Sequence, residues 1–250
     1  MTTTVWDKIY RNYVKGEVYW VLKSDSIMPD FKSYVEKSTF SVKEALDIGC
    51  GRGQYLKYLE ELGFSVSGID SSPTAIDLSK AILSAKANVA VADMFRYEIP
   101  KDKFDLIVSI SAIHHGGREE VNNVINRVIS AIRPNGKIFI IIPVYPDERL
   151  IHRQYKKMNS RIKRLISGRV PNRGTIETRW EHVDGADGGN EDDYIYLKDG
   201  ATLSISGPEK GIIHAFYKRE ELDKLFSNCR EHTIERKAAE WIIKATRAAD

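Results

Sequence analysis

The sequence predicts an α/β fold in which a mostly parallel sheet is covered by helices on both faces. Short runs rich in valine and isoleucine recur between residues 45 and 143, and segments with helical spacing separate them. A glycine-rich turn, ALDIGCGRGQ (Ala45–Gln54), joins the first run to a helical segment. Parallel sheets bind ligands beyond the carboxyl ends of their strands, where the strand order reverses. We therefore expect the ligand site at this first turn.

Five runs are expected to be strands, and three segments between them are expected to be helices. The strands are ALDIG (Ala45–Gly49), FSVSGID (Phe64–Asp70), NVAVAD (Asn88–Asp93), FDLIVSIS (Phe104–Ser111) and KIFIIIP (Lys137–Pro143). Apolar residues at helical spacing predict helices over Tyr55–Leu62, Ala75–Ile82 and Val121–Ile132. Two serines before Pro73 favour a helix start, and RPNGK (Arg133–Lys137) is typical of a helix stop followed by a turn.

The alternation of strands and helices stops after residue 143 and resumes near residue 212. Tyr145–Gly211 is expected to hold a basic amphipathic helix, a loop rich in Gly and Asp, and short strands. KREELDKLF (Lys218–Phe226) predicts a helix, and CREHTIERKAA (Cys229–Ala239) with EWIIKATRA (Glu240–Ala248) predicts a closing antiparallel hairpin.

Because the last elements of the sheet lie beyond the irregular segment, we interpret the chain as one domain with an insertion. Its expected parts are an N-terminal helical cover (1–40), a cofactor-binding core (41–144), an insertion or lid (145–211), and a closing helix with an antiparallel hairpin (212–250).

Composition sets limits on the class of protein. The 250 residues are 42% hydrophobic with a formal net charge of +3, a balance that does not by itself imply a nucleic-acid partner. Two cysteines, Cys50 and Cys229, suit a reducing compartment better than a disulfide framework. The start MTTTVWDK lacks the layout of a signal peptide, and the longest apolar run, IFIIIPV (Ile138–Val144), is too short to span a bilayer. A soluble, cytoplasmic protein is expected.

The glycine-rich turn departs from the pattern that binds dinucleotides. That pattern needs glycines at positions one, three and six, whereas this chain has Gly49, Gly51 and Gly53 with Gln54 at the sixth position. Asp47 would place a negative charge beside a diphosphate, but the same carboxylate suits a ligand that carries an ammonium or sulfonium group. A nicotinamide-dependent oxidoreductase is therefore the weaker interpretation.

Two further acids are expected at the same edge of the sheet. Asp70 in GIDSS ends the second predicted strand, where it can accept hydrogen bonds from ribose hydroxyls. Asp93 in VADMF ends the third, where it can accept one from an exocyclic amine such as that of adenine. Each could instead cap a helix, and the glycines could simply form a tight turn. Their joint placement favours a nucleoside with a cationic amino-acid tail and no phosphate, which describes S-adenosylmethionine.

On these motifs, the region from Ala45 to Pro143 resembles the core of the class I S-adenosylmethionine-dependent methyltransferases. The resemblance rests on LDIGCGRG, GIDSS, VADMF, FDLIVSISAIHH and IRPNGKIFII, and HAFYKREELDKLF resembles the end of the family's fold. It implies a Rossmann-like, seven-stranded, mostly parallel sheet with an insertion after strand five.

The same resemblance implies which residues hold the cofactor. The expected cofactor-binding residues are Asp47, Gly49, Cys50, Gly51 and Gly53 for the methionine part, Asp70 and Ser71 for the ribose, Asp93 and Met94 for the adenine, and Ser109 beside the methionine part. Cys50 is also interpreted as a small packing residue that is not a nucleophile.

Catalysis by such an enzyme consists mainly of alignment and exclusion of water, so no metal is required and none is expected. A general base is needed only if the acceptor must lose a proton. Candidates are His114 and His115 of AIHH, which could instead form a structural turn, and Tyr10. The N-terminal aromatic residues could fold over the cofactor or form the buried face of a covering helix: Trp6, Tyr10, Tyr13, Tyr19 and Trp20.

The partner is left open between several classes. Arg149–Arg173 contains nine Lys or Arg and no acid, so it could contact RNA phosphates, a membrane surface or an acidic small molecule, or be a solvated lid helix neutralised by the acidic loop after it. A small-molecule acceptor is the first expectation. An RNA acceptor, including transfer RNA, is the second. A protein that binds the cofactor without catalysis remains a third alternative.

Overall fold

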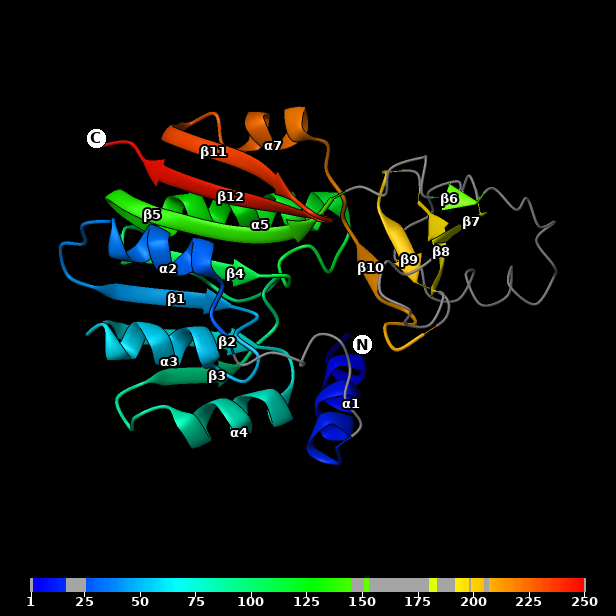
Figure 1. The fold of residues 1–250 in the computed structure, drawn as a ribbon, viewed down its shortest axis with the longest axis horizontal. Coiled ribbons are helices and arrows are strands. Elements are labelled where there is room, and N and C mark those ends of the chain that lie inside the picture. Colours follow the sequence, from blue (N-terminus) through cyan, green and yellow to red (C-terminus); the bar gives the residue numbers. More distant parts are fainter. Residues whose placement is uncertain are drawn as a thin grey trace.

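The protein is described by a computed structural model that covers residues 2–16, 26–144, 151–152, 180–183, 192–197, 199–204 and 207–249. Its main sheet has seven strands in the order β11-β12-β5-β4-β1-β2-β3 (Figure 1). Neighbours in this sheet are parallel except for β12, which is antiparallel to both β5 and β11. The strands are β1 (Glu44–Ile48), β2 (Ser65–Asp70), β3 (Asn88–Val91), β4 (Phe104–Ile110), β5 (Ile132–Pro143), β11 (Cys229–Lys237) and β12 (Glu240–Arg247). The predicted α/β fold, its seven strands and its closing hairpin are confirmed.

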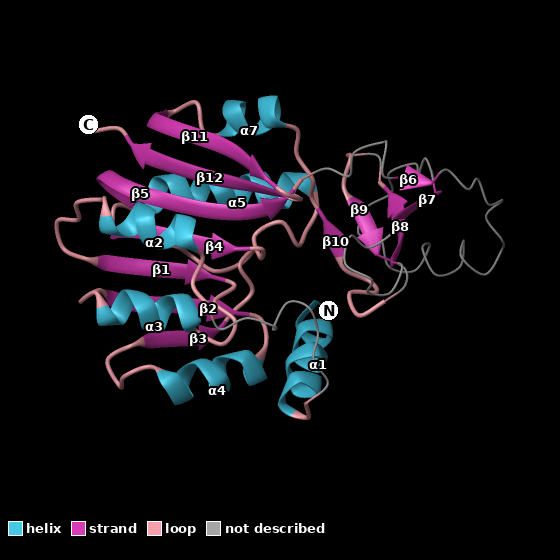
Figure 2. Ribbon diagram, in the orientation of Figure 1, coloured by secondary structure: helices cyan, strands magenta, loops and turns pink. Residues whose placement is uncertain are grey.

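Helices cover both faces of the main sheet (Figure 2). One face carries α2 (Pro29–Glu36), α3 (Gln54–Glu61) and α4 (Pro73–Ile82), whose apolar residues form one buried cluster with the sheet. The other carries α5 (Arg118–Ala131) and α7 (Arg219–Leu225), which form a second cluster. Because both faces of the central strands are buried, these strands read as continuous apolar runs rather than alternating ones.

Several strand ends differ from the sequence-based expectation by one or two residues, and the start of β5 differs by five. β5 begins at Ile132, five residues before the expected Lys137, because Phe104 pairs with Ile132 while Leu106 already pairs with Lys137. The predicted turn over residues 133–136 is thus retained as a bulge within the strand. β3 ends at Val91 and not at Asp93, whose carboxylate accepts a hydrogen bond from the Phe95 amide in the turn that follows.

Helix α1 (Thr2–Val14) lies at the carboxyl edge of the main sheet, beside the start of α4 (Figure 1). One carboxylate oxygen of Asp7 accepts hydrogen bonds from the Ser72 hydroxyl and from the amide and hydroxyl of Thr74, all at the start of α4. These contacts fix the N-terminal helix to the core. Of the expected aromatic residues, Tyr19 and Trp20 lie outside the described residues.

A second, five-stranded antiparallel sheet lies beyond the carboxyl ends of the parallel strands, in the order β10-β9-β8-β7-β6 (Figure 1). Its strands are β6 (Ile151–His152), β7 (Trp180–Val183), β8 (Asp192–Tyr196), β9 (Thr202–Ser204) and β10 (Ile213–His214). Because Ile151 and His152 are in a strand, a basic helix does not begin at Ile151; the rest of that segment, residues 153–173, lies outside the described residues.

The chain leaves the main sheet and returns to it at neighbouring positions. Val144, directly after β5, forms an isolated parallel bridge with Tyr217, and its amide donates a hydrogen bond to the Ala239 carbonyl. Among the described residues, the stretch that carries the second sheet thus begins and ends next to the same edge of β5 and β12. In the part of the chain that the structure describes, no helix has the length and apolar character needed to cross a membrane.

Candidate functional site

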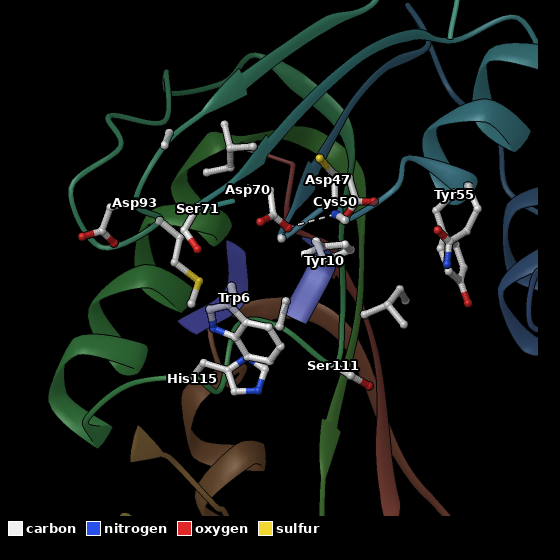
Figure 3. Close-up of a pocket in the computed structure, with 18 of the residues that line it drawn as sticks. Trp6, Tyr10, Asp47, Cys50, Tyr55, Asp70, Ser71, Asp93, Ser111 and His115 are labelled. Atoms are coloured by element: carbon white, nitrogen blue, oxygen red, sulfur yellow. Dashed lines mark hydrogen bonds between the residues drawn. The ribbon is translucent and has the colours of Figure 1, made fainter. Parts of the chain in front are cut away.

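A cavity of about 420 Å³ opens at the carboxyl ends of β1, β2 and β4, under helix α1 (Figure 3). It is the place where the strand order reverses, since β1 lies between β2 and β4. Its volume is in the range of small-molecule sites. Eight of the ten predicted cofactor-binding residues line it: Asp47, Gly49, Cys50, Gly51, Asp70, Ser71, Asp93 and Met94.

Asp47 is a buried carboxyl group with one oxygen that has no partner among the described residues. It is the fourth residue of β1 and only 2% exposed, and its Oδ1 has no hydrogen-bond partner among the described residues. Burial and the nearby charge of Asp70 raise the pKa of Asp47 to about 8. A buried carboxylate without a partner is unfavourable, so this position is suited to a cationic group of a ligand.

Asp70, at the end of β2, holds the glycine-rich turn in place. Its Oδ2 accepts a hydrogen bond from the Gly51 amide at 3.0 Å and its Oδ1 accepts one from the Ser72 amide at 2.9 Å. Burial raises the pKa of this carboxyl group, while these backbone hydrogen bonds oppose the rise. Each oxygen retains a further lone pair, so the carboxylate can still accept hydrogen bonds from a ligand.

Gly51 brings the turn close to the covering helix. It has a φ of +53°, and a Cβ at this position would lie 2.6 Å from the hydroxyl oxygen of Tyr10. Tyr10 lines the cavity and is 7% exposed. Burial, together with the charge of Asp70, raises the pKa of Tyr10 well above its usual value, so the phenol stays protonated at neutral pH.

The remaining two predicted cofactor residues are not among those that line the cavity. Gly53 precedes α3, and its amide donates to the Cys50 carbonyl, which closes the turn. Ser109 is fully buried in β4; its hydroxyl donates to the Ile48 carbonyl and accepts from the Ile113 amide. Both residues shape the backbone beside the site.

The opposite side of the cavity is lined by groups from several elements. Trp6 of α1 packs against His115, with ring centroids 4.6 Å apart (Figure 3). Ser111, after β4, has a φ of +50°, which is uncommon for a residue other than glycine and occurs preferentially at functional sites. Its hydroxyl donates to Glu240 at the start of β12 (3.4 Å), and burial raises the pKa of Glu240.

The two candidate histidines are placed differently. His115 lines the cavity, whereas His114 lies behind it. Burial lowers the pKa of both imidazoles well below the usual value, and neighbouring histidines lower it further. Both rings are therefore neutral at physiological pH.

Sequence reasoning did not identify several residues of this site. Phe95, Ser111 and Glu240 line the cavity, and His214 contacts both candidate histidines from β10. Phe95 is the last residue of the quoted motif VADMF, but no role was expected for it. Glu240 and His214 belong to late segments that carry no local signal of a site.

Comparison with known proteins relates this cavity to a family. Residues 45–136 match the family described as a methyltransferase domain. A ubiquinone biosynthesis O-methyltransferase of Schizosaccharomyces pombe is 28% identical over 119 residues, which are 44% of this chain and 42% of that protein. A tRNA (carboxymethyluridine(34)-5-O)-methyltransferase of Saccharomyces cerevisiae is 32% identical over 96 residues, 38% of this chain and 33% of that one. The chain thus spans about two-fifths of the length of the curated relatives it matches first.

The fold as a whole is shared with solved structures. An amino pentose methyltransferase of Micromonospora echinaspora, solved with S-adenosylmethionine bound, superposes with a TM-score of 0.58 at 17% identity; the alignment covers 96% of this chain and 97% of that one. Residues of the matched segment form most of the cavity lining. Residues 45–136 therefore resemble a methyltransferase domain, and the chain shares the fold of S-adenosylmethionine-dependent methyltransferases of solved structure.

Proposed function

We propose that this protein transfers a methyl group from S-adenosylmethionine to a small-molecule acceptor. The observation that carries the proposal is Asp47, a buried carboxylate with one oxygen unpartnered among the described residues, at the entrance of a glycine-rich turn. The ammonium group of the methionine part would compensate this charge. A diphosphate at the same place would be repelled.

Each part of the donor has matching groups in the cavity. Asp47, Gly49, Cys50 and Gly51 would surround the methionine part. Asp70 and Ser71 would accept the ribose hydroxyls, and Asp93 with Met94 would border the adenine, where Phe95 adds an aromatic edge. Gly53 and Ser109 would act by shaping the turn and the end of β4, without touching the cofactor.

The acceptor would bind on the side formed by Trp6, His115, Ser111 and Glu240. In the reaction, the acceptor's nucleophilic atom attacks the methyl carbon, the carbon–sulfur bond breaks, and the sulfonium becomes the neutral thioether of S-adenosylhomocysteine. The protein's task is to align the reactants and exclude water. The cover supplied by α1 supports a small acceptor, as do the relatives that methylate ubiquinone precursors and an amino pentose by name.

The cellular setting follows from the same features. Cys50 and Cys229 are both free and buried, which suits a reducing compartment, so we place the protein in the cytoplasm. The segment 145–211 is proposed to act as a lid over the acceptor side; β10, which follows it, contacts His115 of the cavity wall through His214.

Isothermal titration calorimetry tests the donor. S-adenosylmethionine and S-adenosylhomocysteine should bind with one site per chain, and NADH should not bind. Asp70→Ala should weaken binding by about 1–3 kcal/mol because charged hydrogen bonds are lost. The control is Asp77→Ala, because Asp77 is an exposed acid on α4 away from the cavity. NADH binding in place of the adenosyl compounds would contradict the proposal.

A screen with methyl-labelled donor tests the reaction itself. Label should pass to a component of a metabolite pool and not to total transfer RNA. Label in transfer RNA would replace the small acceptor by RNA. Donor binding without transfer to either pool would support a non-catalytic binding protein.

A further inference from the structure

Three histidines from separate parts of the chain meet beside the acceptor side of the cavity. His114 and His115 follow β4, and His214 ends β10 in the second sheet. All three are buried, with exposures of 5%, 8% and 4%. One ring nitrogen from each lies within 4.8 Å of the others.

The ring positions resemble those of imidazoles that share one metal ion. Three imidazoles bound tetrahedrally to zinc at a nitrogen distance of about 2.0–2.1 Å place their ring centroids roughly 5 Å apart. The centroids of His115 and His214 are 5.1 Å apart, and those of His114 and His214 are 5.6 Å apart. The pair His114–His115, at 3.9 Å, would have to open slightly.

A carboxylate orients the cluster from behind. Glu209, itself buried at 6% exposure, lies 2.8 Å from Nε2 of His214 through its Oε2. Histidines that bind metals commonly use one ring nitrogen for the metal and direct the other to a carboxylate, which fixes the ring. The segment after β4 and the segment after β10 are also joined directly, because the Ala215 amide donates a hydrogen bond to the His114 carbonyl at 2.8 Å.

One nitrogen of the cluster lacks a partner. Nδ1 of His114 is buried and has no hydrogen bond within the described residues. Buried polar atoms are nearly always satisfied, so such an atom requires an explanation.

We propose that His114, His115 and His214 form a binding site for a divalent transition metal of the zinc type, oriented by Glu209. Three histidine ligands leave a coordination position for water or another oxygen ligand, as in catalytic zinc sites. His115 belongs both to the cluster and to the cavity wall, so the metal would lie directly behind the acceptor side. This site does not depend on the identity of the methyl donor.

Metal titration of the full-length protein tests the site. After treatment with a chelator and its removal, Co²⁺ should bind with one equivalent per chain and give the intense visible absorption of a low-coordinate ion, and Zn²⁺ should displace it. His214→Ala and His114→Ala should each weaken Co²⁺ binding by at least about 100-fold. Glu209→Gln should weaken it by about 10–100-fold, since only the orienting group is lost.

Two controls make the result specific to this cluster. His232→Ala alters a histidine of β11 that pairs with Asp223 away from the cavity, and it should leave metal binding unchanged. The double variant His152→Ala with His182→Ala removes two histidines that are register partners in β6 and β7. It should also bind one equivalent of Co²⁺ with wild-type affinity.

The proposal is overturned if wild-type protein binds Co²⁺ no better than His214→Ala, or if binding is lost in the β6–β7 double variant and kept in His214→Ala. Far-UV circular dichroism serves as the readout of folding for every variant. If the alanine variants fail to fold, thermal unfolding decides: Zn²⁺ should raise the Tm of the wild type more than that of Glu209→Gln, and equal shifts contradict the site.

Discussion

Asp47 is the carboxyl group at the beginning of the glycine-rich turn, and its surroundings explain why a ligand with a cationic group fits there. In the free protein it is buried and its Oδ1 has no partner among the described residues, and its pKa is raised to about 8. Between its unfolded pKa near 3.8 and that value, the folded state holds a proton that the unfolded state does not. The free energy of unfolding therefore falls as pH rises through this window.

The first prediction concerns this titration. A cation placed beside Asp47 favours the ionised carboxylate, so binding of S-adenosylmethionine should release protons at pH values below about 8, and affinity should rise between about pH 6 and about pH 8. Calorimetry in two buffers of different ionisation enthalpy measures the release. Asp47→Asn should bind more weakly and show no proton release; release of equal size in this variant would contradict the assignment.

The second prediction separates close approach from backbone strain at glycine. Gly51 and Gly63 both have positive φ, but a Cβ at Gly51 would lie 2.6 Å from the Tyr10 hydroxyl, whereas at Gly63 its nearest neighbour is the Lys43 Nζ at 4.0 Å. Gly63→Ala should therefore cost about 1 kcal/mol of stability and leave donor affinity unchanged.

Gly51→Ala should reduce stability at least as much and also weaken binding of S-adenosylhomocysteine by tenfold or more, because the turn or Tyr10 must move. Denaturant unfolding and calorimetry measure the two effects. Equal donor affinity in both alanine variants would mean that this close approach has no role in binding.

The sequence predicts the position of some site residues but not their contacts. Asp47, Asp70 and Asp93 could be placed at one edge because each follows an apolar run, and all three line the cavity. That Asp70 also holds the Gly51 amide depends on the fold of the turn. His214 meets His114 only through the return of a distant strand, and no local pattern predicts such a contact.

At the scale of elements, Asp7 is the side chain through which α1 hydrogen-bonds to the start of α4. Burial alone would raise the pKa of Asp7, but the hydrogen bonds from Thr74 and Ser72, together with the charge of Arg11, lower it overall. A lowered pKa means that this carboxylate stabilises the fold above the unfolded value, and that the contribution is lost as pH falls through the folded value.

The third prediction concerns helix α1, which covers the cavity. Asp7→Ala removes three hydrogen bonds at the start of α4 and should loosen α1, which increases the dissociation rate of S-adenosylhomocysteine and the rate of proteolysis within residues 2–16. Arg11→Ala removes only the exposed partner of Asp7 and should change both rates little. Stopped-flow dissociation and limited proteolysis are the measurements; equal effects of the two variants would refute this role of Asp7.

The elements of the main sheet were predictable because each one carries its own pattern of apolar residues in the sequence. Runs such as the one in β4 are buried on both faces and cannot be mistaken for surface strands. Strand ends were less predictable, because the bulge in β5 depends on pairing with β4 and is not encoded within the strand. The second sheet has strands as short as two residues, which are too short for a periodic pattern to reveal.

At the scale of the whole molecule, the balance between a small acceptor and RNA depends on charge. A protein that neutralises several phosphates loses about 10³–10⁵-fold in affinity between about 50 mM and about 200 mM salt. The fourth prediction is that KM for the acceptor found in the labelling screen changes by less than about threefold over this range. Steady-state kinetics measures it, and a steep increase in KM would favour RNA.

The attachment of the second sheet has a further consequence for how such proteins diversify. Val144 and Tyr217 are bridge partners, so the intervening stretch begins and ends at one point of the scaffold. Replacing a stretch with touching ends perturbs the rest of a protein little, since the gap to be closed does not change. A segment of different length or sequence between Val144 and Tyr217 is therefore expected to leave the cavity at the other strand ends unchanged.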